Sequence, residues 1–278
     1  MTVSARARRA LGRGLLALLL WVVSLVILIP FWMMLIDSFK DARESALPSI
    51  ALPSTWHFEN YAVVFQRGGI GRSLANSVLV TGSSVLLTAV VAAAAALYLA
   101  RKSTRSSRLI YNAFSIGLIA PLSIIPTIKL MQFLHINNTY GSVIVLMCAV
   151  NLPVAVFLCT AFVKTIPREL DEASSIDGSN SFTLLWRVIL PLMQPVIMTV
   201  AILVFMAVWN SFMIPLYFLN NSAKWTLPLT VYGFFGRYSH DWNLVDADLI
   251  ITALPVVIFY LVSQRYIISG MTAGAVKG

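Results

Sequence analysis

Residues 167–191 read PRELDEASSIDGSNSFTLLWRVILP and form the one extended polar segment in the second half of an otherwise nearly apolar chain. Pro167 suits a first helical position, and the three acids that follow it place negative charge near the positive end of a helix dipole. Leu170, Ala173 and Ile176 recur at helical spacing and form one narrow apolar face. This half of the segment therefore predicts a short amphipathic helix.

The other half of the segment predicts a turn and a second helix. Asp177 and Gly178 are a turn pair, and Ser181 is placed to cap the helix that follows. Two interpretations of the resulting elbow are open: a helix resting on lipid headgroups, or a surface for a protein partner. Helices on lipid surfaces usually carry Lys and Arg on their polar face, whereas acids dominate here. The charge pattern therefore favours a protein partner.

The composition is typical of an integral membrane protein. Hydrophobic residues make up 59% of the 278 residues, and charged residues make up only 11%. Several apolar runs of about twenty residues exclude a single-pass anchor, and the lack of alternating ten-residue segments excludes an outer-membrane barrel. Cys148 and Cys159 are expected to be small buried core residues, and the three histidines show no metal-ligand spacing. We therefore expect no metal site.

The apolar segments predict an all-α membrane protein with six transmembrane helices. The second helix is rich in small residues, which let helices pack closely in lipid, so we expect it inside the bundle. The third helix contains Pro121 and Pro126, and these kinks fit either a helix that lines a pathway or plain packing. The six helices are expected at about 15–36, 74–100, 109–131, 142–163, 192–219 and 248–263.

The basic residues predict which side of the membrane each segment occupies. With both termini in the cytoplasm, thirteen of the twenty Lys and Arg and four of the eleven acids fall on the cytoplasmic side. The firmest mark is the run of four cations at 101–108. The entire net charge of +9 then lies inside, as the positive-inside rule requires. The elbow is therefore predicted to be cytoplasmic and the segment 37–72 external.

The sequence shows no catalytic constellation and no energy source of its own. The histidines are far apart, and the acids lie in loops and at helix ends. The GGIG at 68–71 lacks the Lys-Ser/Thr of a phosphate-binding loop, so the chain is not expected to hydrolyse ATP. The spans carry almost no ionisable residues, which disfavours an ion-coupled carrier. A solute path of this kind needs energy from outside, and the elbow is where that energy could enter.

The elbow resembles a known signature. EAS at 172–174, Gly178 and VILP at 188–191 match the EAA-x3-G-x9-I-x-L-P signature of the permease subunits of bacterial ABC importers. The stretch EASSIDGSN at 172–180 is similar to the corresponding sequence of the carbohydrate-importer branch. The tail 272–278 is similar to the ending of maltose-type second permeases. Ser174 replaces the second alanine and Val188 replaces the isoleucine, and both changes are conservative.

This resemblance implies a type I ABC importer transmembrane domain over 73–268, with 167–191 as its coupling elbow and cytoplasmic segments at 1–14 and 269–278. The implied partners are a second permease subunit in a heterodimer, a cytoplasmic ABC ATPase dimer, an extracytoplasmic sugar-binding protein and membrane lipid, with no nucleic acid. ATP is used by the ATPase, and this chain is expected to bind no cofactor. The residues implied to contact the ATPase are Glu169, Glu172, Ala173, Ser174, Asp177, Gly178, Leu190 and Pro191.

The carbohydrate branch also typically carries Trp-Asn-x-Phe in the fifth helix, which is Trp209-Asn210-Ser211-Phe212 here. Trp209 and Asn210 lie about midway along that predicted helix, and sugars stack on aromatic faces and hydrogen-bond to amides. A Trp that fills the bundle and an Asn bonded to a neighbouring helix fit the same residues. The aromatic-rich external loop 220–247 likewise fits a dock for the binding protein or a loop packed on the bundle.

We therefore expect a permease without enzymatic activity, in the bacterial cytoplasmic membrane, that forms half of the path for a sugar or oligosaccharide. An ABC importer for a non-sugar solute is the alternative within this class. An ion-coupled secondary carrier is the alternative from a different class, and the lack of inverted halves with paired broken helices counts against it.

Overall fold

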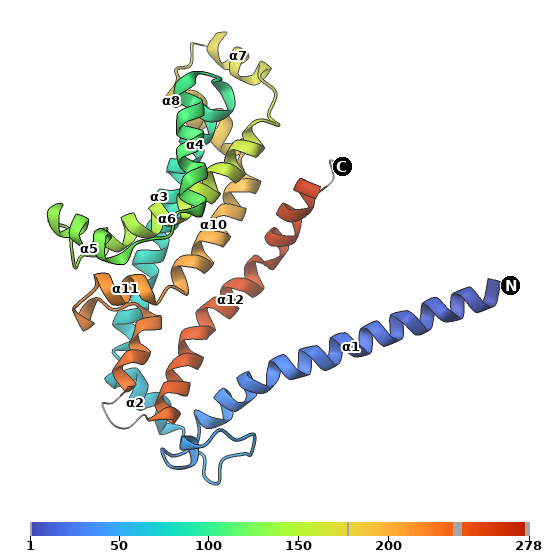
Figure 1. Cartoon of the computed structure of the whole chain (residues 1–278), viewed down its shortest axis with the longest axis vertical. Coiled ribbons are helices and arrows are strands. Elements are labelled where there is room, and N and C mark those ends of the chain that lie inside the picture. Colours follow the sequence, from blue (N-terminus) through green and yellow to red (C-terminus); the bar gives the residue numbers. More distant parts are fainter. Residues whose placement is uncertain (1, 177, 236–240, 276–278) are drawn as a thin grey trace. The chain divides into compact units, whose positions relative to one another are not determined.

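The computed structural model describes the backbone of residues 2–176, 178–235 and 241–275. The described chain is helical almost throughout, and Figure 1 shows the order of its elements. Contacts divide it into two units. Unit 1 comprises Met1–Ile70 and Val231–Ala253, and unit 2 comprises Gly71–Thr230 and Leu254–Gly278.

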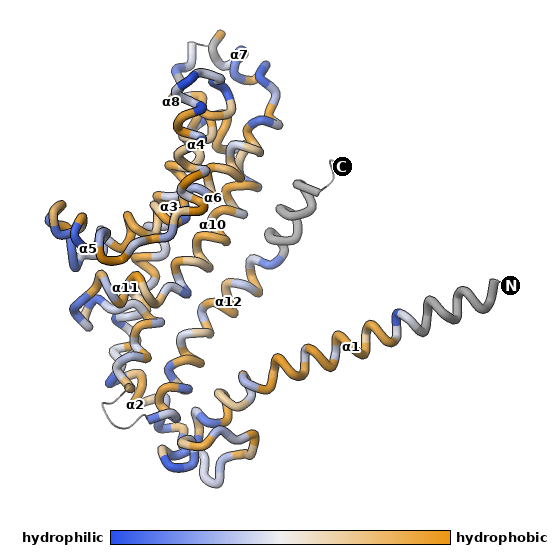
Figure 2. Tube along the Cα trace, viewed as in Figure 1, coloured by the Kyte–Doolittle hydropathy of each residue, from blue (hydrophilic) through white to orange (hydrophobic). Residues whose placement is uncertain are grey.

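Four of the described helices are long and apolar enough to cross a membrane. Lipid offers no hydrogen-bond partners, so an apolar run that crosses it forms a helix, in which the backbone N–H and C=O groups bond to each other. Leu184–Leu192 and Gln194–Trp209 count as a fifth span if they are taken together across a bend of 78°. Figure 2 shows the apolar colouring along α1, α6 and α10. The four are Gly12–Asp37 within α1 (Thr2–Asp37), α3 (Ile70–Arg101), α6 (Tyr140–Val163) and Trp242–Gln264 within α12 (Trp242–Ala275).

The core of unit 2 forms where small side chains of α3 meet α6 and α10 (Gln194–Trp209). Ala92, Ala93 and Ala96 are at most 1% exposed, and they belong to one cluster with Met147 of α6 and Val200 of α10. The prediction that this small-residue helix lies inside the bundle is confirmed. Both cysteines of α6 are buried and free, as expected.

The helix α4 (Arg105–Ile119) packs on α6. A Cβ on Gly117 would lie 3.1 Å from Pro153 Cγ, so glycine permits a close approach of the two helices. The Tyr111 ring meets the Phe157 ring edge to face, with centroids 4.8 Å apart. These contacts fix α4 along the side of α6.

The predicted single helix 109–131 is corrected to two helices, α4 and α5 (Ile124–Phe133). Pro121 lies in the joint between them and has no N–H with which to continue the helical ladder. A residue before proline is also pushed out of the helical region, and Ala120 is extended with φ −68° and ψ 120°. Together these effects end α4 at Ile119.

Two other predicted helices have different limits in the structure. The predicted helix 192–219 is interrupted at 210–212, between α10 and α11 (Met213–Phe218). The last helix begins at Trp242 rather than at about 248, because Leu244 and Val245 are buried and extend its packed face. The predicted loop before it contains the 3-10 helices η3 (Ser222–Lys224) and η4 (Leu227–Phe234).

Hydrogen bonds to Asn76 gather three segments at the start of α3 in unit 2. The Asn76 side-chain amide donates to the carbonyls of Ala223 and Trp225 at 3.1 and 2.9 Å. The Tyr140 hydroxyl, at the start of α6, donates to Asn76 Oδ1 at 2.8 Å. Because α3 and α6 start together here, both helices run in the same direction toward residues 101 and 163.

Unit 1 is held together by buried polar contacts between the segment just after α1, α2 (Glu59–Arg67) and α12, next to the short η1 (Glu44–Ala46). Asn60 donates to the carbonyls of Ser38 and Lys40, both at 2.9 Å, and Asn243 donates to Asn60 Oδ1 at 3.1 Å. The Lys40 ammonium is fully buried and lies 2.6 Å from Asp37 Oδ1. Buried polar groups with partners of this kind specify one arrangement of the segments.

Candidate functional site: the elbow between α6 and α10

The elbow begins with α7, which spans Glu169–Ile176. Its first turn holds three acids, as the sequence predicts, and these complement the positive end of the helix. The N–H groups of Asp171 and Glu172 both donate to the carbonyl of Arg168, at 2.9 and 3.2 Å. Glu169 and Glu172 are exposed, so two acids of this turn remain open to a partner.

The third acid, Asp171, instead contacts Arg101, the last residue of α3. Arg101 Nε lies 2.6 Å from Asp171 Oδ2, and Nη2 donates to Asp171 Oδ1 at 3.2 Å. Arg101 Nη1 also donates to the carbonyl of Ile166 at 3.0 Å. The Arg101 and Asp171 side chains are only 13% and 20% exposed. A planar guanidinium with two contacts to one carboxylate fixes the orientation of that carboxylate as well as its distance. Arg101 therefore ties the start of α7 to the end of α3.

The far end of α7 is a turn at Gly178, whose φ of 76° lies in the left-handed region. The Ser179 N–H donates to the carbonyl of Ser174 at 3.0 Å, the long bond that closes a helix around a left-handed residue. A Cβ on Gly178 would meet no heavy atom within 4 Å, so the backbone and not lack of space requires glycine. Ser174 itself is 8% exposed, and the predicted site residue Asp177 lies outside the described residues.

The second helix of the elbow starts with α8 (Ser181–Thr183). Because Ser181 is already the first residue of this helix, the capping position falls on Asn180 and not on the predicted Ser181. Asn180 Oδ1 accepts the Thr183 N–H at 2.9 Å and the Thr183 hydroxyl at 3.1 Å, as a capping Asn does. The chain continues through the π-helical η2 (Leu184–Ile189) into α9 (Leu190–Leu192), where Leu190 is half-buried and Pro191 is exposed.

The elbow exposes apolar side chains beside its acids. Ile176 is 86% exposed and Phe182 is 69% exposed, while α7 as a whole sits at one end of unit 2 (Figure 1). Single exposed apolar residues are ordinary, whereas a group of them on adjoining short helices indicates a contact surface. We call this group with its acid the elbow surface; it consists of Leu170, Glu172, Ala173, Ile176, Phe182 and Trp186.

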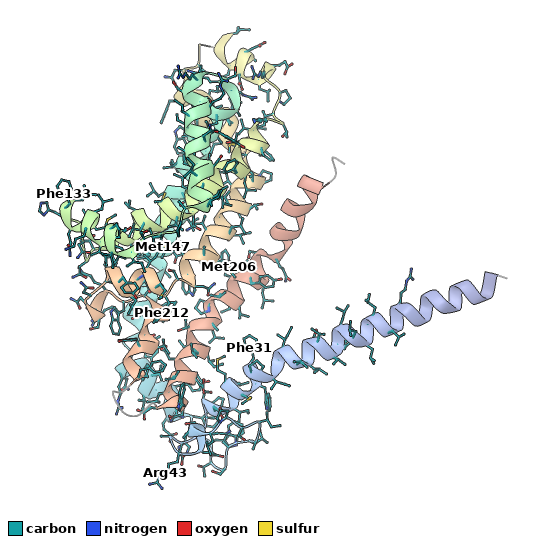
Figure 3. All side chains as sticks on the ribbon, in the orientation of Figure 1. Phe31, Arg43, Phe133, Met147, Met206 and Phe212 are labelled. Carbon is teal, nitrogen blue, oxygen red and sulfur yellow. The ribbon has the colours of Figure 1, made fainter. Side chains whose placement is uncertain are left out.

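Trp209 and Asn210 lie at the end of α10 and not midway along a helix as predicted. Trp209 is 4% exposed and stacks on Phe205 with ring centroids 5.4 Å apart. Asn210 is exposed, and its amide donates to the carbonyl of Met206 at 2.9 Å. Met206 and Phe212, on the two sides of the break before α11, are labelled in Figure 3. Trp209 is thus a packed residue, and Asn210 is the accessible one of the two.

Comparison with known proteins decides the family. Residues 2–273 match the family described as the binding-protein-dependent transport system inner membrane component. The chain belongs to this family of transport permeases. The permease is 34% identical over 258 residues to the probable starch degradation products transport system permease protein AmyC of Thermoanaerobacterium thermosulfurigenes, which covers 92% of the permease and 94% of the relative. It is 32% identical over 276 residues to the melibiose/raffinose/stachyose import permease protein MelC of Bacillus subtilis. This alignment covers 98% of the permease and 100% of MelC.

Solved structures match the fold of the permease. A chain of a bacterial ABC transporter involved in the import of the acidic polysaccharide alginate aligns with a TM-score of 0.79 at 22% identity, over 94% of the permease and 98% of that chain. The resemblance indicated by the elbow signature is therefore confirmed at the level of the family. This family consists of multi-pass inner-membrane permeases and not of enzymes.

The structure gathers the described elbow residues of the permease but separates them from Trp209 and Asn210. The helix α10 starts just after the elbow and ends at Trp209, and its sixteen residues span about 24 Å. Sequence patterns had predicted neither Arg101 as the partner of α7 nor Asn180 as the cap of the second elbow helix. Asn before a helix is a signal that could have found the cap, whereas no local pattern connects residues 70 positions apart.

Proposed function

We propose that this permease is one of two membrane subunits of an ABC importer for a sugar or oligosaccharide. AmyC and MelC are described as permeases for starch degradation products and for melibiose, raffinose and stachyose, and they match the permease over nearly their whole length. In this proposal a second permease completes the path, a cytoplasmic ATPase dimer supplies energy and an extracytoplasmic binding protein delivers the sugar. A solved neighbour described in complex with an alginate pentasaccharide-bound periplasmic protein supports the last of these partners.

We infer six membrane crossings with both termini in the cytoplasm. The helix α4 starts just after Arg101, at the elbow end of α3, whereas α6 starts at the opposite end, where Tyr140 contacts Asn76. The chain therefore crosses the same thickness between these points, and α4 and α5 are the helices available for it. Counting this broken span with the four long helices and the bent pair gives six.

The coupling role of the elbow rests on one observation, the elbow surface. Arg101 holds the start of α7, and the left-handed turn at Gly178 closes its end. The helix therefore has little conformational freedom left to lose on docking. Docking on an ATPase buries Ile176 and Phe182, and Glu172 is placed to meet a cation or a helix N-terminus of that partner. Closure of the ATPase pair on ATP then moves the elbow, and α3 moves with it through Arg101.

Substitution within the elbow surface tests this role. Ile176→Ser is expected to lower the ATPase stimulation by a sugar-loaded binding protein about tenfold or more, because burial of such a side chain contributes about 2–3 kcal/mol to docking. The measurement uses the complete transporter, two permeases with the ATPase dimer, in nanodiscs. Ile50→Ser is the matched control, since Ile50 is 68% exposed but belongs to the predicted external segment. Full stimulation in Ile176→Ser would contradict the coupling role.

We further propose that Asn210 lines the sugar path. It is exposed at the break after α10, where an amide could hydrogen-bond to sugar hydroxyls. Asn210→Ala should raise the KM for uptake or change the range of sugars transported, while expression stays normal. Uptake kinetics over a panel of oligosaccharides measure this, and unchanged KM and range would remove Asn210 from the path. Ile50→Ala, at an exposed position in the segment 37–72, serves as the control.

A further inference from the structure

A second feature of unit 2 is a cavity of about 270 Å³ beside the end of α3. Three cations line it: Lys102 just after α3, Arg108 in α4 and Lys164 just after α6. Ser107 and Asn112 of α4 add a hydroxyl and an amide. The stretch 99–112 and the distant residue Lys164 thus bring three positive charges and two polar groups around one space, and the elbow mechanism does not use this space.

The positive charge around this cavity is not balanced by acids of the permease. The lining contains no Asp or Glu, and no ion pair joins Lys102, Arg108 or Lys164 to an acid of the described residues. The first turn of α4 has no acid, and Arg108 lies near the positive end of this helix. A cation at that end repels the helix dipole, so a bound anion that neutralises Arg108 lowers the free energy of the site.

The cavity lies at the depth where the apolar spans end. The span of α3 ends at Arg101 and that of α6 ends at Val163, each next to a cation of the cavity. Beyond the cavity, α4 exposes apolar residues, with Leu109 62% exposed and Ile116 66% exposed. A ligand that fits both parts has a compact anionic group and long apolar chains.

We propose that this cavity binds the phosphate of an anionic phospholipid, with the acyl chains along the exposed face of α4. Basic pockets between membrane helices on the cytoplasmic side suit such headgroups, because the cations there face lipid phosphate at short range. The site differs from the general attraction of basic loops to lipid, since it requires the three lining cations and not the total charge. It is also independent of the elbow and of the transported solute.

Lipid retention by the purified full-length permease tests this. Detergent-solubilised protein is mixed with phosphatidylglycerol, or with phosphatidylcholine as the neutral lipid, and bound lipid is counted by native mass spectrometry. Lys102→Gln/Arg108→Gln/Lys164→Gln is expected to lower the affinity for phosphatidylglycerol at least tenfold and to leave phosphatidylcholine unchanged. The matched control Arg13→Gln/Arg105→Gln/Arg187→Gln removes the same charge outside the cavity and should retain phosphatidylglycerol within about twofold.

Three outcomes would overturn the proposal. An equal loss in both triple variants would mean diffuse electrostatic attraction. Tight binding of inorganic phosphate that displaces phosphatidylglycerol would identify a free-anion site instead. Unchanged binding in the cavity variant would exclude the lining cations. If that variant does not fold, Arg108→Gln alone is measured against Arg105→Gln, and the charge-conserving Lys102→Arg/Lys164→Arg should keep the lipid.

Discussion

At the residue scale, Gly178 shows how one backbone angle shapes the elbow surface. Its positive φ turns the chain after α7, and the bond from Ser179 to Ser174 closes the helix end. Space is open around it, so a larger side chain meets nothing within the permease. The requirement for glycine is therefore conformational, and any steric conflict of a substituent would arise with a docked partner.

Substitutions of Gly178 separate these two effects. Gly178→Val is expected to cost about 1–2 kcal/mol because a branched residue is strained in the left-handed region, and to uncouple transport while membrane insertion stays normal. Gly178→Asn should cost less, since Asn tolerates that region. Thermal unfolding, insertion level and sugar-stimulated ATPase activity measure the three effects. Loss of insertion together with transport in both variants would count against a coupling role.

At the element scale, α7 is fixed to α3 rather than only to the helices that precede and follow it in sequence. Arg101 contacts both Asp171 in α7 and the carbonyl of Ile166 in the segment before it. An ion pair that is mostly shielded from water and has two contacts is stronger than an exposed surface pair. A force on the elbow therefore reaches α3, whose small residues form the core with α6 and α10.

A double-mutant cycle measures this connection. Arg101→Gln and Asp171→Asn are each expected to lower the stability of the permease and the sugar-stimulated ATPase activity, and the pair is expected to lose little more than either alone. The coupling free energy should be about 1–3 kcal/mol. Thermal unfolding in detergent and ATPase assays of the complex provide the two measurements. Arg105→Gln is the control, and additive losses would show that the two residues act separately.

At the scale of the whole molecule, the distribution of charge and the direction of the helices agree on one orientation. The cations at 101–108 and the elbow meet at the same end of unit 2, where α3 and α6 end. The opposite end of unit 2 carries the Asn76 contacts. With the first end in the cytoplasm, the positive-inside rule is satisfied by the three-dimensional arrangement as well as by the sequence.

Cysteine accessibility tests this orientation. Ile176→Cys is expected to react with a membrane-impermeant maleimide only after the cytoplasmic side is opened, whereas Ile50→Cys should react in intact cells. Both positions are strongly exposed, and the native Cys148 and Cys159 are buried, so background labelling should be low. Labelling of Ile176→Cys in intact cells would reverse the orientation.

Features that depend on neighbouring residues alone, such as apolar spans and turns, could be predicted from the sequence. Long apolar runs gave the spans at 74–100 and 142–163 nearly as the structure has them, and the turn at Gly178 followed from its residue type. The helix 109–131 was predicted whole because its apolar run is continuous, although Pro121 is sufficient to end α4. The partnership of Arg101 with Asp171 depends on how α3 and α6 pack side by side, which no window of sequence contains.

The position of Arg101 in the sequence also determines when it can pair with Asp171. It is synthesised 70 residues before Asp171, so for that interval Arg101 cannot yet pair with Asp171. In the proposed orientation, with this end of α3 in the cytoplasm, Arg101 then counts in full toward the excess of positive charge on that side. Once the elbow has been synthesised, Asp171 pairs with the same charge, and the ion pair connects α7 to α3. If the proposed orientation holds, a single arginine first favours the insertion of α3 in one direction and later holds α7 in the folded permease.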